Sequence, residues 1–217
     1  MKIFLDTACV ATICRLYHDK MIDGITTNPS LIADYSTKHT IPTPEIIQNL
    51  ANITEPLPIS IEVTDHTEKG MYEQAQKWLD LSHNFVIKVP VTPTGLSLCR
   101  HLVQQGVRVN VTLCFSVNQA ILAAKAGATY VSPFVGRLDD AGSDGIDLVS
   151  KIAQVYRENN CQTQILAASL RHPWHVESAL LAGANIVTMP PSLFDKLYDH
   201  PMTKQGIDQF EKDWTNV

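Results

Sequence analysis

Charge is scarce in this sequence, and its positive residues are not gathered into a basic run. Only 18% of the 217 residues are charged, and the formal net charge is −5 at pH 7. A protein that follows a nucleic-acid backbone needs concentrated Lys and Arg to neutralise the phosphates. The sequence therefore argues against a nucleic-acid partner, and any anionic ligand must be held by a few local positive groups.

Paired cysteines and long apolar runs are missing as well. The five cysteines are odd in number and form no CxxC pair, which suits reduced thiols better than a disulfide framework. No run approaches the ~20 apolar residues of a spanning helix, and the short apolar stretch at the amino terminus contains Asp6. These features predict a soluble, cytoplasmic protein with no membrane contact.

Nucleotide and metal motifs are also lacking. Neither GxGxxG nor GxxxxGKS/T occurs, so no dinucleotide or P-loop nucleotide is indicated. His172 and His175 have the i, i+3 spacing of some metal ligands, but no HExxH motif or acidic triad accompanies them. The sequence accordingly predicts no metal site.

What the sequence does contain is apolar material in a regular alternation of elements. Hydrophobic residues make up 45% of the chain, enough for one sizeable core. Short runs rich in Val, Ile and Thr alternate with segments of helical spacing, which is typical of βα units around a parallel sheet. There are eight such runs, at 2–6, 24–28, 59–63, 85–89, 108–114, 130–134, 164–169 and 186–189. The predicted fold is an α/β, single-domain (β/α)₈ TIM barrel over residues 1–217.

Helical spacing is clearest at 68–81, 116–126, 145–159 and 173–182. Gly127 and Gly183 follow two of these segments where a left-handed cap is expected, and each leads into a strand. Residues 33–44, which include Pro42 and Pro44, are expected to form the loosest loop.

A carboxyl-terminal extension exceeds what a minimal barrel needs. A short helix is expected near 193–198, followed by a break at Pro201 and a helical tail at about 203–214. Phe210 and Trp214 share one face of that tail, so they need a surface to cover. Either this barrel or a neighbouring subunit can supply it.

Alternation along the strands directs several polar residues into the barrel. Successive strand residues face the interior and the helices in turn, and Lys88 has the parity opposite to Phe85, Ile87 and Val89. Other polar residues near strand carboxyl ends are Asp6, Asn28, Glu62, Asn110, Thr112, Ser132 and Ser169. Because the active sites of such barrels form at that end, these side chains are expected to converge on one cavity. For any single Ser or Thr, the alternative is a buried polar network that only closes the barrel.

Lys88 is the residue that the apolar pattern explains least. A buried ammonium is costly and is usually retained for chemistry or for a tight ion pair. Burial favours the neutral amine, which attacks carbonyls, so we expect an imine that serves as an electron sink for carbon–carbon bond cleavage or formation. Asp6 and Glu62 are the expected proton carriers. Their alternative role is an ion pair with Lys88.

Two arginines follow late strands. Arg137 lies just beyond the sixth run, and Arg171 lies just beyond the seventh, two residues after Ser169. Barrels commonly seat a phosphate near their late loops, and a guanidinium matches its geometry. The expected substrate is a phosphorylated sugar. A surface salt bridge with Asp139 or Asp140 is the competing interpretation of Arg137.

Several motifs together resemble those of the small transaldolases, which are grouped with fructose-6-phosphate aldolase. They are KIFLDTA at 2–8, GITTNPS at 24–30, VIKVP at 86–90, VSPFVGR at 131–137 and AASLRHP at 167–173. The similarity runs nearly end to end. It implies transfer of dihydroxyacetone from sedoheptulose 7-phosphate to glyceraldehyde 3-phosphate, giving erythrose 4-phosphate and fructose 6-phosphate, with no cofactor. Relatives also form decamers of two five-membered rings, in which the last helix packs on a neighbour.

The resemblance implies a role for each matching residue. Lys88 matches the Schiff-base lysine, Asp6 the acid that handles protons, and Glu62 with Thr112 the pair that positions a catalytic water. The implied substrate-binding residues are Thr27, Asn28, Asn110, Ser132, Phe134, Arg137, Ser169 and Arg171. The implied phosphate site comprises Arg137, Ser169 and Arg171. Leu170 replaces a Phe or Ile of relatives, an apolar exchange.

Glu62 and Phe134 bear on the choice between transfer and simple cleavage. The similar fructose-6-phosphate aldolases carry Gln and Tyr at these two positions, so the resemblance favours a transaldolase. Two alternatives stay open: an aldolase that releases free dihydroxyacetone, and a catalytically silent barrel that only binds sugar phosphates.

Overall fold

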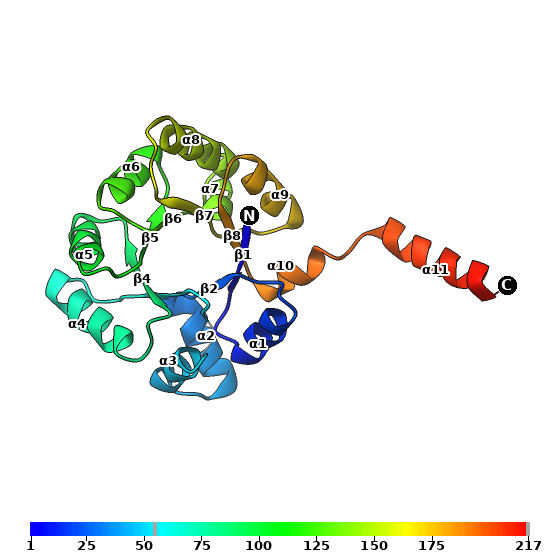
Figure 1. Cartoon of the computed structure of the whole chain (residues 1–217), viewed down its shortest axis with the longest axis horizontal. Helices are drawn as coiled ribbons and strands as arrows, with labels where there is room; N and C mark the ends of the chain where they lie inside the picture. Colours follow the sequence, from blue (N-terminus) through cyan, green and yellow to red (C-terminus); the bar gives the residue numbers. More distant parts are fainter. Residues whose placement is uncertain (54–55, 216–217) are drawn as a thin grey trace.

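The expected barrel is confirmed by the computed structural model, which describes residues 1–53 and 56–215. Eight parallel strands close in the order β1 to β8, with helices forming an outer ring (Figure 1). The strands are β1 Lys2–Asp6, β2 Gly24–Thr26, β3 Ile59–Glu62, β4 Phe85–Pro90, β5 Val109–Cys114, β6 Tyr130–Pro133, β7 Gln164–Ala167 and β8 Ile186–Met189. Each overlaps one of the eight predicted runs, with bounds that differ by at most two residues.

The helices follow the strands around the ring. They are α1 Val10–His18, α2 Pro29–His39, α3 Thr43–Ala51, α4 Glu68–Leu79, α5 Pro93–Gln104, α6 Val117–Lys125, α7 Val135–Asp140, α8 Gly145–Glu158, α9 Pro173–Leu181, α10 Pro191–Lys196 and α11 Pro201–Thr215. Gly127 and Gly183 have φ values of 85° and 103°, so both expected left-handed turns are confirmed. Among the described residues, no helix is both long and apolar enough to cross a bilayer.

The predicted loop at 33–44 is wrong, because most of it is helical. Asn28 caps α2 by accepting a hydrogen bond from the Leu31 amide, and α2 continues to a left-handed turn at Thr40. Pro42 is the N-cap residue of α3, and Pro44 lies in its first turn. A proline there loses no helical hydrogen bond, so this pair marks a helix start rather than an unstructured segment.

The barrel interior has an apolar lower half. Phe4, Val86, Tyr130, Leu166 and Ile186 form one buried cluster together with Ala168. The rings of Phe4 and Tyr130 meet edge to face with centroids 6.0 Å apart. These residues have the same strand parity as the polar residues nearer the carboxyl ends, whereas the larger apolar cluster lies between the strands and the helices.

The last helix does not pack on its own barrel. None of the residues of α11 is buried, and the side chains of Phe210 and Trp214 are 75% and 84% exposed. Figure 1 shows α11 extending away from the ring of helices. Within the single chain, the interpretation that this tail caps its own barrel is wrong.

Candidate active site

Lys88 lies inside the barrel at the level where several polar side chains replace the apolar ones. The strand register pairs Lys88 with Glu62 of β3 on one side and with Asn110 of β5 on the other. Its side chain is 5% exposed, and its Nζ lies 3.1 Å from Glu62 Oε2. Nζ also donates a hydrogen bond of 3.0 Å to the carbonyl oxygen of Thr27. The ammonium is thus held by one carboxylate and one carbonyl.

Asp6 occupies a different environment from Glu62. Its Oδ1 accepts a hydrogen bond of 2.7 Å from the hydroxyl of Thr26, whose oxygen lies 2.7 Å from that of Thr188. Because the single proton of Thr26 goes to Asp6, Thr188 donates to Thr26. Burial raises the pKa of Asp6, against the opposing effect of the nearby Lys88 charge. A carboxyl group of this kind suits proton transfer better than one that is always ionised.

Asn110 and Ser132 belong to a hydrogen-bonded network inside the barrel. Asn110 Nδ2 donates to Ser60 Oγ at 3.1 Å, and its Oδ1 accepts from the Ser132 hydroxyl at 2.7 Å. All three side chains are almost completely buried. The side chains of Asn110 and Ser132 therefore form a buried polar network, which is the alternative to a binding role that the sequence left open.

Thr112 is the exception to this satisfied network. Among the described residues its buried Oγ1 has no hydrogen-bond partner. The register of β5 shifts between Val111 and Cys114, and Leu113 adopts a φ of 57° beside it. An unsatisfied buried hydroxyl costs about 1–3 kcal/mol, so Thr112 retains a hydrogen-bonding capacity that no described residue uses.

A cavity of about 120 Å³ opens over Lys88 at the carboxyl ends of the strands. Seven of the twelve predicted site residues line it: Asp6, Asn28, Lys88, Ser132, Phe134, Arg137 and Ser169. The remaining lining residues are Thr26, Ala168 and Thr188. The other five, Thr27, Glu62, Asn110, Thr112 and Arg171, are not among its lining residues. Most of the residues expected to converge thus do so.

The five that do not line the cavity have other positions. Thr27 uses its hydroxyl to donate to Ser60 O at 2.8 Å, and its carbonyl to hold Lys88. Glu62 lines an adjacent hollow of about 420 Å³ while it pairs with the lysine. Arg171 is exposed, and its Nη2 lies 2.7 Å from Asp140 Oδ2.

Arg137 reaches the cavity over an aromatic ring. Its guanidinium carbon lies 5.1 Å from the ring centroid of Phe134, in a cation–π arrangement. In residues 1–53 and 56–215 no ion pair involves Arg137, because Asp140 pairs with Arg171 and Asp139 with His175. The salt-bridge interpretation of Arg137 is therefore wrong.

The two histidines considered as metal ligands have other partners. His175 Nε2 lies 2.9 Å from Asp139 Oδ2, and its Nδ1 accepts from the Arg171 amide at 3.2 Å. Both ring nitrogens are occupied, so His175 is not free to bind a metal. Within the described part of the chain, no group of three or more His, Cys, Asp and Glu side chains is arranged to hold an ion.

Sequence reasoning missed Thr26, Ser60, Thr188 and the pair His175 and Asp139. The first three share the inward strand parity of the predicted residues, so strand parity is the sequence signal that points to them. The contact between His175 and Asp139 joins distant segments, and no local spacing reveals it.

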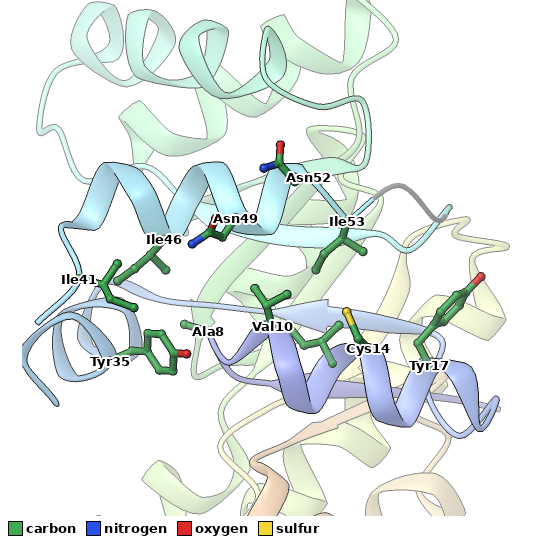
Figure 2. A pocket seen from close by; sticks show the side chains of 11 residues that line it. Ala8, Val10, Cys14, Tyr17, Tyr35, Ile41, Ile46, Asn49, Asn52 and Ile53 are labelled. Atoms are coloured by element: carbon green, nitrogen blue, oxygen red, sulfur yellow. The ribbon is translucent and has the colours of Figure 1, made fainter. Parts of the chain in front are cut away.

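Two larger hollows lie outside the barrel, away from Lys88. One of about 490 Å³ lies among α1, α2 and α3, where Cys14 of α1 points toward Ile53, which follows α3, and Tyr35 of α2 lies at one end (Figure 2). Another of about 830 Å³ is lined by residues of α6 and α8 and of the segments that follow them. Of these three, the smaller polar cavity is the one lined by Lys88 and Asp6.

Comparison with known proteins agrees with this geometry. The family model described as transaldolase/fructose-6-phosphate aldolase matches residues 3–217. A probable transaldolase of Caulobacter vibrioides is 47% identical over 217 residues, covering 100% of this chain and 98% of its own length. Those of Leptospira biflexa and Nitrosopumilus maritimus are each 44% identical, covering 98% and 100% of this chain and 97% and 96% of their own lengths. The chain belongs to the transaldolase/fructose-6-phosphate aldolase family.

Proposed function

We propose that this chain is a transaldolase of the pentose phosphate pathway. It transfers a dihydroxyacetone unit from sedoheptulose 7-phosphate to glyceraldehyde 3-phosphate, giving erythrose 4-phosphate and fructose 6-phosphate. The observation that carries the proposal is Lys88, buried between a carboxylate and a carbonyl beside a second acid, Asp6. The three relatives described above, each a probable transaldolase similar over the full chain, support it.

In the proposed reaction, Lys88 loses a proton and its amine attacks the ketose carbonyl. Loss of water from the carbinolamine gives a protonated imine, which draws electrons from the bond between the α and β carbons of the sugar. Asp6 accepts the proton of the hydroxyl on the departing carbon, so an aldehyde leaves and an enamine stays on Lys88. Attack of the enamine on the acceptor aldehyde, with return of the proton from Asp6, reverses these steps. Water held by Glu62 and Thr112 then releases the product.

Cavity size supports the transfer of a small unit. At about 120 Å³, the cavity is well below the roughly 300–1,000 Å³ typical of pockets for drug-sized ligands. A three-carbon fragment can lie on Lys88 between Asn28 and Ser132, with the rest of the sugar directed outward. The phosphate then lies at the rim, beside Arg137, Ser169 and Arg171.

The choice of transfer over cleavage rests on Phe134 and Glu62. Phe134 lines the cavity without a hydroxyl that could deliver a proton to the enamine, and Phe115 packs against it with centroids 5.7 Å apart. The enamine should therefore persist until an acceptor aldehyde arrives. The double variant Phe134→Tyr and Glu62→Gln is expected to raise the ratio of cleavage to transfer. An unchanged ratio would remove this explanation.

Borohydride reduction in the presence of fructose 6-phosphate tests the proposed chemistry directly. Intact-mass measurement should show one reduced adduct per chain, on Lys88, and none with Lys88→Met. Lys125→Met, on the outer helix α6, is the matched control and should retain the adduct. A wild-type chain without an adduct would point to a silent sugar-phosphate-binding barrel.

Coupled assays with and without erythrose 4-phosphate then separate the two family activities. A transaldolase consumes fructose 6-phosphate rapidly only when the acceptor is present. Equal rates in both assays would instead identify a fructose-6-phosphate aldolase.

We further propose that the protein works in the cytoplasm as a homo-oligomer, a decamer of two pentameric rings. The unpacked helix α11 supports this, because Ile207, Phe210 and Trp214 lie along one face at 52%, 75% and 84% exposure. Large apolar side chains grouped in this way mark interaction surfaces. Light scattering should give the mass of a decamer for the full chain and a smaller particle for a chain ending at His200. A full chain that is monomeric at micromolar concentration would oppose the proposal.

A further inference from the structure

Arg137, which lines the cavity, and Arg171, which does not, lie on neighbouring segments, α7 and the loop between β7 and α9. The amides of Val135 and Gly136 donate to the carbonyls of Ala168 and Ser169 at 3.0 Å and 2.9 Å. A Cβ at Gly136 would lie 2.2 Å from Ser169 O and 2.6 Å from Arg171 Cγ, so any larger residue would force the segments apart. The distance between Arg137 and Arg171 therefore depends on how this loop is held against α7.

His175 connects the same two segments through both of its ring nitrogens. The residue is 3% exposed. Its Nδ1 accepts a hydrogen bond from the backbone amide of Arg171 at 3.2 Å, so Nδ1 carries no proton. The proton is on Nε2, which lies 2.9 Å from Asp139 Oδ2 and donates to it. The two partners fix one neutral tautomer of the imidazole.

Asp139 is itself anchored. Its other oxygen, Oδ1, accepts from the amide of Gly145 at 2.9 Å, at the first residue of α8. A chain of hydrogen bonds therefore runs from the start of α8 through Asp139 and His175 to the backbone of Arg171. Asp140 holds the guanidinium of the same arginine at 2.7 Å. The backbone of this arginine is thus fixed independently of its side chain.

We infer that His175, oriented by Asp139, is a positioning residue that sets the β7–α9 loop so that Ser169 and Arg171 meet the substrate phosphate beside Arg137. This inference rests on the proposed function, because the ligand of the arginines is taken to be a sugar phosphate. His175 does not line the cavity over Lys88, so it acts on the phosphate end of the substrate and not on the reacting carbons. Changing it should weaken recognition of phosphate and leave imine chemistry intact.

The test compares fructose 6-phosphate with unphosphorylated fructose as donors, in the full-length protein. Loss of one or two hydrogen bonds predicts that His175→Ala raises the KM for fructose 6-phosphate and the inhibition constant of inorganic phosphate by about 3- to 10-fold. The kcat for fructose 6-phosphate and the kcat/KM for fructose should stay within about 2-fold, since neither depends on phosphate contacts.

Conservative variants separate the two hydrogen bonds of the imidazole. His175→Asn keeps an acceptor near the Nδ1 position, so it should recover part of the phosphate affinity that His175→Ala loses. Asp139→Asn leaves the imidazole in place and removes its charged partner, and it should raise the same two constants. It serves the test equally if His175→Ala does not fold.

His172→Asn is the matched control. The ring of His172 lies beside that of His175, with centroids 3.7 Å apart and planes tilted by 42°, but its side chain makes no capping hydrogen bond to α9. This variant should leave the constants for phosphate and for fructose 6-phosphate unchanged.

Two results would overturn the inference. One is an equal loss of kcat/KM for the phosphorylated and unphosphorylated donors in His175→Ala, which would indicate a purely structural role. The other is an unchanged inhibition constant for phosphate in both His175→Ala and Asp139→Asn. If the wild-type chain formed no borohydride adduct, the proposed function would fail. Thermal shifts caused by inorganic phosphate in wild type and variants would then still test the role of His175.

Discussion

The lower and upper halves of the barrel interior are built by the same strands with the same parity, yet they contain opposite chemistry. In β4, Val86 packs in the apolar cluster while Lys88, two residues further on, is a buried cation. In β1, Phe4 fills the lower half while Asp6 lies at the cavity. The difference shows that the fold needs an inward-facing residue at each position, but only the lower half needs it to be apolar.

The energetic balance of the two halves differs accordingly. Burial of a large apolar side chain stabilises the fold by about 1.5–3 kcal/mol, whereas an unsatisfied buried hydroxyl such as that of Thr112 costs about 1–3 kcal/mol. Changes in the upper half should therefore remove activity with little loss of stability. Changes in the lower half should do the reverse.

The largest effect is expected from Lys88→Met. Transfer activity should fall by several orders of magnitude, because no other group at the cavity can form the imine. Far-UV circular dichroism should remain that of the wild type. An active Lys88→Met protein would end the assignment of chemistry to the upper half, and Lys2→Met, at the start of β1, is a control that should keep full activity.

Asp6→Asn should lower kcat by about 10²- to 10⁴-fold, the usual contribution of a general acid or base. The substitution should not lower the free energy of unfolding at neutral pH, although it lowers kcat. The folded-state pKa of Asp6 is raised, so its stabilising contribution is present below the unfolded pKa and is lost as the pH rises through the folded value. The variant should thus be at least as stable as the wild type at neutral pH. Urea unfolding at pH 5 and 8 checks this, and a marked loss of stability at pH 8 would contradict it.

Phe4→Ala tests the lower half. The ring is fully buried against Tyr130, so its removal should reduce the free energy of unfolding by about 3–5 kcal/mol. Because the cavity residues are unchanged, the kcat of the protein that remains folded should change little. Urea titration and an assay at low temperature give both quantities. A large fall in kcat with intact stability would show that the two halves are not separable.

Thr112→Val tests the difference between the two halves at one hydroxyl group of the upper half. Replacing the hydroxyl by a methyl removes a polar group that has no partner in the described residues, so the protein should be as stable as the wild type or about 1 kcal/mol more stable. In the proposed reaction Thr112 helps to hold the water of hydrolysis, so product release should slow. Thermal unfolding and pre-steady-state kinetics provide the measurements. Lower stability would mean that this hydroxyl is satisfied in solution.

The smallest effect concerns pH and His175. Burial lowers the pKa of its imidazole, the neighbouring His172 adds to this, and Asp139 opposes it. A lowered folded pKa means that the stabilising contribution is present above the unfolded value of about 6.5 and is lost as the pH falls through the folded value. The Tm difference between wild type and His175→Asn should therefore shrink from pH 8 to pH 5. A difference that grows on acidification would show that the protonated imidazole is the stabilising form.

Local patterns account for most of the fold. Eight apolar runs and their parity predicted every strand and the inward direction of Lys88, because each depends only on nearest neighbours along the chain. The sequence pattern does not predict the helices at 29–39 and 43–51, because Pro42 and Pro44 suggest a loop, whereas in the structure they mark the start of a helix. The outward projection of α11 could not be decided from a pattern that requires a covering surface without saying which one.

The sequence alone determined the barrel, the position of a buried lysine at the carboxyl end of the fourth strand, and the family resemblance carried by the motifs around it. The tertiary structure decided which polar residues are partners. It paired Lys88 with Glu62, directed Arg171 to Asp140, and joined His175 to Asp139. Strand periodicity sets the direction of a side chain, whereas the distance between two side chains depends on the register and closure of the whole barrel.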